Sequence, residues 1–247
     1  MPGRLPALAA LALLGASTAV SAGEAAPEAP YTDLTQAFVE FYDRTEGMTD
    51  EARVAAFKAN VAPRFPGFYT PRDGKSEERW ERQITSQLAA FPAIRERYVA
   101  AQRDFGRAYA DARRHFALTF PDSHARIDTW FLHSLGEMDG GTREIDGRTV
   151  LIFGADGIAR YHSPEDIGPF FDHELFHVEH GQYFPECEPV WCALWIEGLA
   201  TAAAEQMNPG IGEKALMLET PKPIAPSVAL TSGSAVAGGM WARSASW

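Results

Sequence analysis

The sequence is poor in cysteine, in positive charge and in long apolar runs. Its 247 residues include only two cysteines, too few for a small domain held together by a disulfide framework. Lys and Arg number 22 against 33 Asp and Glu, and the formal charge of -11 repels phosphate backbones and anionic lipid headgroups. We therefore expect no nucleic-acid partner.

Apolar and aromatic residues are plentiful. Hydrophobic residues make up 46% of the chain and aromatic residues 11%, which is enough to bury a real core and excludes a disordered linker or tail. The seven histidines are unevenly spread, because His173, His177 and His180 fall within eight residues. This cluster is the first candidate for chemistry.

Residues 1–22 predict export. They contain one cation, Arg4, then an apolar run from about Leu8 to Leu14, then small residues that end at Ala22. This is the pattern of a secretory signal peptide cleaved near Ala22. The apolar run is too short and too rich in alanine to span a bilayer, so we expect no stable membrane insertion after cleavage. The protein would then act in the periplasm of a bacterium or outside the cell.

Export affects the interpretation of Cys187 and Cys192, which are separated by four residues. In an oxidising compartment such a pair favours a disulfide that closes a tight loop. The alternative is half of a thiolate metal site, which needs two further ligands at matching spacing. Because the sequence has no second cysteine pair, we expect the disulfide.

Apolar residues recur with helical spacing from residue 32 to about residue 120. We expect this part to be helical, after a flexible, aperiodic lead-in at residues 23–31. Prolines and glycines between Pro63 and Gly74 predict a loop. Four helices are predicted, beginning near Thr32, residue 50, Ser76 and Pro92.

The period of the pattern changes in the second half of the chain. Residues 126–135 and 148–153 are rich in β-branched and aromatic side chains, which is typical of strands. Asp146 and Gly147 fit the two-residue turn of a hairpin that joins residues 142–145 to residues 148–153. We therefore expect a small antiparallel sheet, with residues 148–153 as its edge.

Two more helices are expected after the sheet, at about residues 168–181 and 194–207. N-terminal helices, a small sheet and two further helices, in that order, make an α+β fold. We expect one domain over residues 32–220, with a helical part at 32–120 and a second part at 121–220 that carries the chemistry.

Residues 221–247 differ in composition from the rest. They are rich in Pro, Ser, Gly and Ala, with only two charges and no helical period. We hypothesise that this irregular tail is truncated or frameshifted and is not native to the fold. The alternative is a naturally short, flexible tail.

The strongest motif is HExxH, formed by His173, Glu174 and His177. On a helix, positions i and i+4 lie on one face, so both imidazoles can bind one tetrahedral zinc ion. Glu174 leans over the same site. The alternative interpretation is a polar cluster between two helices, in which the side chains hydrogen-bond to one another and bind no metal.

A catalytic zinc usually needs three protein ligands and a water. The metzincin pattern requires glycine and histidine where this sequence has His180 and Tyr183, so that class is excluded. Nineteen residues separate His177 from Glu197, which lies on the second of the two predicted helices. Two antiparallel helices joined by such a loop can bring Glu197 opposite the histidines. His173, His177 and Glu197 would then form the His₂Glu site of a hydrolytic enzyme, with one Zn²⁺ per chain.

The segments FFDHELFHVEHG and WIEGLATAAAEQMNPG resemble the gluzincin (thermolysin-like) zinc metallopeptidases, whose spacing is HExxH, nineteen residues, then Glu. They also look like an uncharacterised bacterial family of predicted zinc-dependent proteases. The match covers about residues 125–220. It implies His173, His177 and Glu197 as zinc ligands and Glu174 as general base, with a zincin-type active-site helix and a second, ligand-bearing helix. It also implies that an extended peptide lies along the strand at residues 148–153.

The resemblance is incomplete at Thr201, where thermolysin-like enzymes have an aspartate that hydrogen-bonds a ligand histidine. A second donor to the oxyanion is expected, and Tyr183, His162 and His180 are candidates. His180 would either line the cleft or cap the end of its helix as a cation, and we expect the cap. Asp172 and Glu179 are expected to be solvated helix charges.

The sequence thus predicts an exported zinc-dependent peptidase that hydrolyses peptides or proteins. Two neutral imidazoles and one carboxylate leave the metal net positive, which lowers the pKa of its water towards 7. Glu174 would take the proton of that water and deliver it to the leaving nitrogen. The alternative, from another functional class, is a catalytically inactive, zinc-stabilised binding or scaffold protein.

Overall fold

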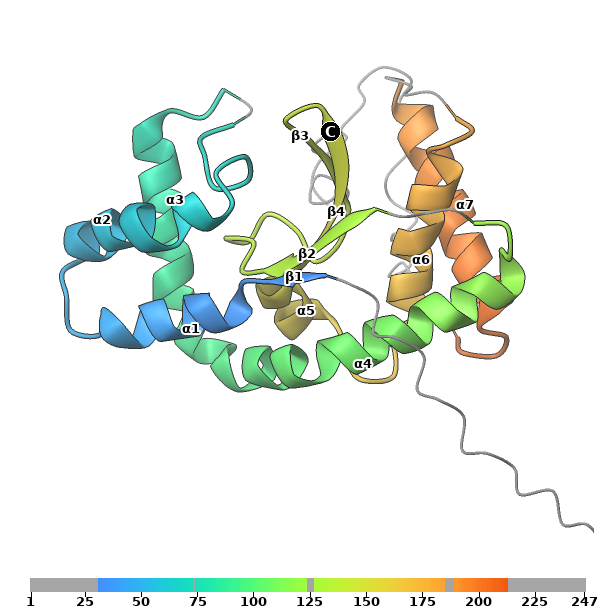
Figure 1. Cartoon of the computed structure of the whole chain (residues 1–247), viewed down its shortest axis with the longest axis horizontal. Coiled ribbons are helices and arrows are strands. Elements are labelled where there is room, and N and C mark those ends of the chain that lie inside the picture. The colour runs from blue at the N-terminus through green and yellow to red at the C-terminus, as the bar shows by residue number, and fades with distance from the viewer. Residues whose placement is uncertain (1–30, 73, 124–126, 185–188, 213–247) are drawn as a thin grey trace, which may run out of the picture.

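The computed structural model describes residues 31–72, 74–123, 127–184 and 189–212 (Figure 1). The predicted signal peptide, the lead-in up to residue 30, Cys187 of the predicted disulfide and the tail at 221–247 lie outside the described residues. Within them, helices precede and follow a small four-stranded sheet, which confirms the α+β prediction.

The helices of the first half begin close to the predicted positions. Polar side chains cap two of them: Oγ1 of Thr49 accepts the amide of Ala52 at 3.3 Å, and Oγ of Ser76 accepts the amide of Arg79 at 3.2 Å. The helices are α1 (Thr35–Arg44), α2 (Asp50–Asn60), α3 (Glu77–Ala90) and α4 (Arg95–Thr119).

Helix α4 starts three residues later than predicted from Pro92. Residues Phe91–Ala93 form a separate turn of 3₁₀-helix, in which the proline occupies one of the first two positions. Proline tolerates that place because the first amides of a helix have no partner within it. The 25-residue α4 then runs beneath the sheet to the second half of the chain (Figure 1).

The sheet contains β1 (Thr32–Asp33), β2 (Asp128–Leu132), β3 (Thr142–Ile145) and β4 (Arg148–Gly154), in the order β1-β2-β4-β3. The hairpin prediction is confirmed, since β3 and β4 are antiparallel and joined by Asp146 and Gly147. Both turn residues have positive φ, 51° and 71°, as a two-residue hairpin turn requires.

Two other predictions about the sheet are wrong. Strand β2 pairs in parallel with both β1 and β4, so the sheet is mostly parallel. Strand β4 lies between β2 and β3, so the edge strands of the described sheet are β1 and β3, and not residues 148–153. The run Val150–Phe153 is fully buried, as expected of an internal strand covered on both faces.

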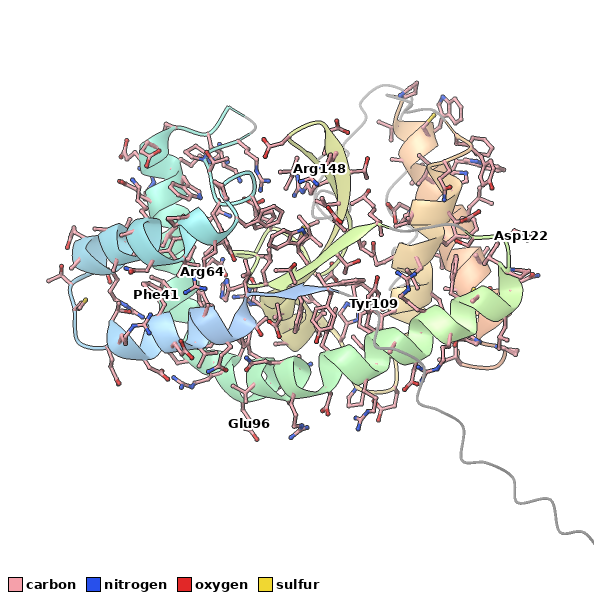
Figure 2. All side chains as sticks on the ribbon, in the orientation of Figure 1. Phe41, Arg64, Glu96, Tyr109, Asp122 and Arg148 are labelled. Carbon is pink, nitrogen blue, oxygen red and sulfur yellow. The ribbon has the colours of Figure 1, made fainter. Side chains whose placement is uncertain are left out.

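Aromatic side chains fill the core on both faces of the sheet. Tyr109 projects from α4 towards the sheet (Figure 2), where its hydroxyl lies 3.0 Å from Oγ1 of Thr129. On the same side, the ring of Phe105 stacks on Phe131 at 3.8 Å. On the opposite face Trp130 stacks on Phe65 at 3.9 Å, so the segment that follows α2 covers that side.

Within the described residues, three helices follow the sheet. The first, α5 (Ala155–Tyr161), directly follows β4 and was not predicted. The others are α6 (Ile167–His180) and α7 (Val190–Met207), which lie side by side at one end of the molecule (Figure 1). Helix α6 matches its prediction to within a residue, and α7 begins four residues earlier than predicted. In the part of the chain that is described, none of the helices is long and apolar enough to cross a membrane.

Candidate metal centre

Helix α6 presents two faces of different chemistry. Phe171 and Leu175, four residues apart, are buried in the core, where Phe171 meets the rings of α4. His173 and His177, also four apart, lie on another face, towards α7. The core face therefore fixes the rotation of α6, and this rotation aims both histidines at α7.

His173, His177 and Glu197 converge between the two helices. Nε2 of His173 lies 2.9 Å from Nε2 of His177 and 3.2 Å from Oε2 of Glu197. The third side of the triangle, from Nε2 of His177 to Oε2 of Glu197, measures 3.4 Å. In the described residues no other three His, Cys, Asp or Glu side chains gather in this way.

The separations fit a small tetrahedral ion. Ligand atoms about 2.1 Å from a tetrahedral zinc are about 3.4 Å from one another, close to the three observed separations. Two imidazoles and one carboxylate are also ligand types that zinc accepts. The three side chains are only partly buried, which leaves one side of such an ion accessible to a water or substrate.

Electrostatics within the cluster favour an ionised Glu197. Burial raises the pKa of Glu197, but the hydrogen bonds and positive charge of His173 and His177 outweigh burial and lower it to about 2. For His177, burial lowers the pKa, but the hydrogen bond with Glu197 and the charge of Glu174 outweigh it and raise the pKa. The carboxylate of Glu197 is therefore negative and ready to bind a cation at neutral pH.

Glu174 occupies a different environment. It is 7% exposed, and burial raises its pKa above the usual value. The carboxylates of Asp139 and Glu197 add to this effect, whereas His173 and His177 oppose it. Glu174 is thus a buried carboxyl group beside the cluster, and its environment favours proton uptake more than that of Glu197 does.

The candidate oxyanion donors differ in position. His162 is buried, and its Nε2 is 3.0 Å from Oδ2 of Asp139, so this nitrogen is already engaged. His180 stacks between the rings of Phe176 and Phe184 at 5.6 and 4.4 Å. Tyr183 is 72% exposed, beyond the end of α6.

The prediction that His180 caps its helix as a cation is wrong. The residue is 8% exposed, and burial, with the nearby His177, lowers the pKa of its imidazole. Both effects disfavour the charged imidazole that a helix cap would need, and the ring lies in an aromatic stack. The spacing of Phe176, His180 and Phe184, four residues apart each time, was the available signal for that stack.

Asp172 and Glu179 are also buried, contrary to the prediction that they are solvated. One oxygen of Asp172 accepts a hydrogen bond from Asn208 at 2.8 Å and lies 2.9 Å from Nδ1 of His115. Glu179 accepts the hydroxyl of Ser123 at 2.6 Å. Both carboxylates link α6 to neighbouring segments, and their partners lie too far away in the sequence for local patterns to reveal them.

One ring nitrogen of a ligand histidine lacks an orienting partner. Nδ1 of His177 is buried, and within the described residues it has no hydrogen-bond partner. A carboxylate that would orient this imidazole is therefore not found there.

Sequence reasoning missed Asp139, Gly140 and Asp166. Asp139 contacts His162, and the backbone of Gly140 packs against Glu174. Asp166, which precedes α6, lies on the other side of His162. The two adjacent glycines after Asp139 were a signal of close backbone approach, but the sequence does not indicate which side chain approaches.

Comparisons of the chain with protein-family models, with curated proteins and with solved structures found no match.

Proposed function

We propose that this chain is a zinc-dependent peptidase of the gluzincin type, exported from a bacterial cell. The observation that carries the proposal is the convergence of His173, His177 and Glu197 from two helices, with the buried carboxyl of Glu174 beside them. HExxH alone places only the two histidines. The third ligand, at a suitable distance from both, supports a hydrolytic site rather than a chance motif.

The side chains of His173, His177 and Glu197 would hold one zinc ion per chain. When bound, zinc would polarise the substrate carbonyl and lower the pKa of a bound water towards neutral pH. The ionised Glu197 offsets part of the ion's charge, and the hydrophobic packing of Phe171 and Leu175 keeps both imidazoles on the same side of α6.

Glu174 would be the general base and then the general acid. Its carboxylate accepts a proton from the attacking water and later donates it to the leaving nitrogen. Both transfers need a group that exchanges protons near neutral pH, and the burial that raises the pKa of Glu174 moves it in that direction.

The structure changes where a peptide substrate is expected to lie. Because β4 is internal, β3 is the edge strand on that side of the sheet among the residues that the structure describes. The segment that leads into β3 touches Glu174 through Gly140, so this edge begins beside the proposed base. We propose that the substrate backbone adds to β3 in an extended conformation.

A metal analysis and a peptide-library assay test the proposal together. We expect about one zinc per purified chain, cleavage of unfolded peptides, loss of cleavage with a chelator and recovery with added zinc. A chain that binds zinc tightly but cleaves no peptide in the library would contradict the peptidase and favour the zinc-stabilised binding protein. A chain without zinc would contradict both.

A further inference from the structure

His162 lies between two carboxylates at the end of α5. Its Nε2 is 3.0 Å from Oδ2 of Asp139, and its Nδ1 is 3.3 Å from Oδ1 of Asp166. The side chain is 1% exposed, and its ring packs on Phe170 at 4.0 Å. Movement of the Asp139 carboxylate would leave the buried Nε2 of His162 without a partner, so the contact between these two residues has a fixed geometry.

One end of the group is fixed at the start of α6. Asp166 directly precedes the helix and accepts hydrogen bonds from the amide and the hydroxyl of Ser163, at 2.8 and 3.0 Å. Phe170, which packs on His162, lies on α6 one turn before Glu174. The group is therefore connected to the helix that carries the HExxH motif.

The other end is fixed in the segment that leads into β3. Burial raises the pKa of Asp139, but the hydrogen bond with His162 outweighs it, so the pKa is lowered and Asp139 is negative at neutral pH. Its Oδ1 accepts the amide of Gly140 at 3.0 Å, and its carbonyl accepts the amide of Gly154 at 2.8 Å. Asp139 thus joins His162 to the strand pair β3 and β4.

The segment held by Asp139 packs directly against Glu174. A Cβ atom on Gly140 would lie 2.8 Å from Cγ and 2.9 Å from Cδ of Glu174, and 2.6 Å from Cζ of Phe170. No side chain fits in that space, so the backbone of Gly140 forms one wall of the site that the Glu174 carboxyl occupies.

We propose that Asp139 and His162 are positioning residues for Glu174. Through Gly140 they hold the segment that leads into β3 against the carboxyl group of Glu174. This contact limits the rotamers of Glu174 and so keeps its carboxyl group at a fixed distance from His173, His177 and Glu197. The inference rests on the proposed function, because it assigns Glu174 as the base. Removing the contact should lower kcat, because a misplaced base slows proton transfer, and should leave the metal ligands in place.

The experiment compares Asp139→Ala with Asp139→Asn in the full chain. Asparagine can still accept the amide of Gly140 and donate to an unprotonated Nε2 of His162, whereas alanine can do neither. Asp43→Ala is the matched control, because it breaks an exposed Asp–Arg pair in the N-terminal half. The measurements are zinc content, kcat and KM on one peptide, and amide hydrogen exchange of residues 139–142.

We expect Asp139→Ala to keep one zinc per chain and to lose at least about 10-fold in kcat with little change in KM. Asp139→Asn should stay within about threefold of the wild type, and Asp43→Ala should match it. Faster exchange at residues 139–142 in Asp139→Ala alone would show that the contact has loosened.

Two results would overturn the inference: wild-type kcat in Asp139→Ala, or loss of zinc and kcat together in both variants at position 139. If Asp139→Ala does not fold, Gly140→Ala gives the same test from the other side, because its methyl group displaces Glu174. An inactive wild type whose exchange pattern still responds to Asp139→Ala would count against the peptidase and not against the contact.

Discussion

Nε2 of His173 lies 3.2 Å from Oε2 of Glu197, although 24 positions separate the two residues. The contact joins α6 to α7 and completes the three-ligand cluster. Without an ion, an imidazole and an ionised carboxylate hold each other by a charge-assisted hydrogen bond. A zinc ion would replace that bond with two coordinate bonds.

Glu197→Ala should weaken zinc binding more than 100-fold, because loss of a direct ligand costs more than loss of an outer partner, which typically costs 10 to 100-fold. Competition with a chromophoric chelator measures the affinity. Glu205→Gln, an exposed position on the same helix, is the control and should bind like the wild type. Equal affinity in Glu197→Ala and Glu205→Gln would remove Glu197 from the site.

Zinc should stabilise the fold, because its ligands come from two different helices and are brought together only in the folded chain. At a free zinc concentration 100 times Kd, linkage adds about 2.7 kcal/mol to the free energy of unfolding. For a chain of this size, Tm should rise by about 5 to 10 °C. Thermal unfolding with chelator and with zinc measures the shift. An unchanged Tm in the wild type would argue against a native site.

Asp156→Ala should destabilise the fold by about 2 to 4 kcal/mol, because it removes the acceptor of two amides. The fully buried carboxylate of Asp156 accepts the amides of Ser134, at 2.5 Å, and Gly136, at 2.8 Å. These bonds hold the bend after β2, where Leu135 has a φ of 57°. Urea unfolding measures the change, and a loss below about 1 kcal/mol would refute this role.

Alanine substitutions at two glycines should change the free energy of unfolding in opposite directions. A Cβ on Gly154 would lie 2.0 Å from the carbonyl oxygen of Met138, so Gly154→Ala must displace backbone and should cost about 3 kcal/mol or more. Gly198 lies within α7 with nothing within 4 Å of its Cβ position, so Gly198→Ala should stabilise by about 1 kcal/mol. Chemical denaturation of both variants checks the pair, and a similar loss in both would contradict the close approach at Gly154.

Local signals made the α-helices of the described residues predictable, with the exception of α5. Ser76 caps α3 as expected, and the apolar spacing of Trp80, Ile84 and Leu88 matches the buried face of that helix. The cluster geometry was also accessible, because i and i+4 spacing on α6 needs only helical periodicity. Bringing Glu197 opposite the histidines needed one further step, namely that α6 and α7 pack side by side.

The sheet order and the contacts of Glu174 were not accessible, because they depend on pairings distant in the sequence. The hairpin turn at Asp146 correctly gives the antiparallel pair, but nothing local indicates that β2 joins the other side of β4 in parallel. Asp139 and His162 lie 23 positions apart, at the ends of different elements, so no periodic pattern connects them. Buried polar pairs of this kind become visible only once the chain is folded.

Glu174→Gln is the variant that tests the central claim most directly. Glutamine is nearly the same size and cannot take up a proton at neutral pH, so the variant should fold, bind about one zinc per chain and lose at least about 100-fold in chelator-sensitive peptide cleavage. Glu205→Gln, prepared in parallel, should cleave like the wild type. Wild-type cleavage by Glu174→Gln would contradict the account.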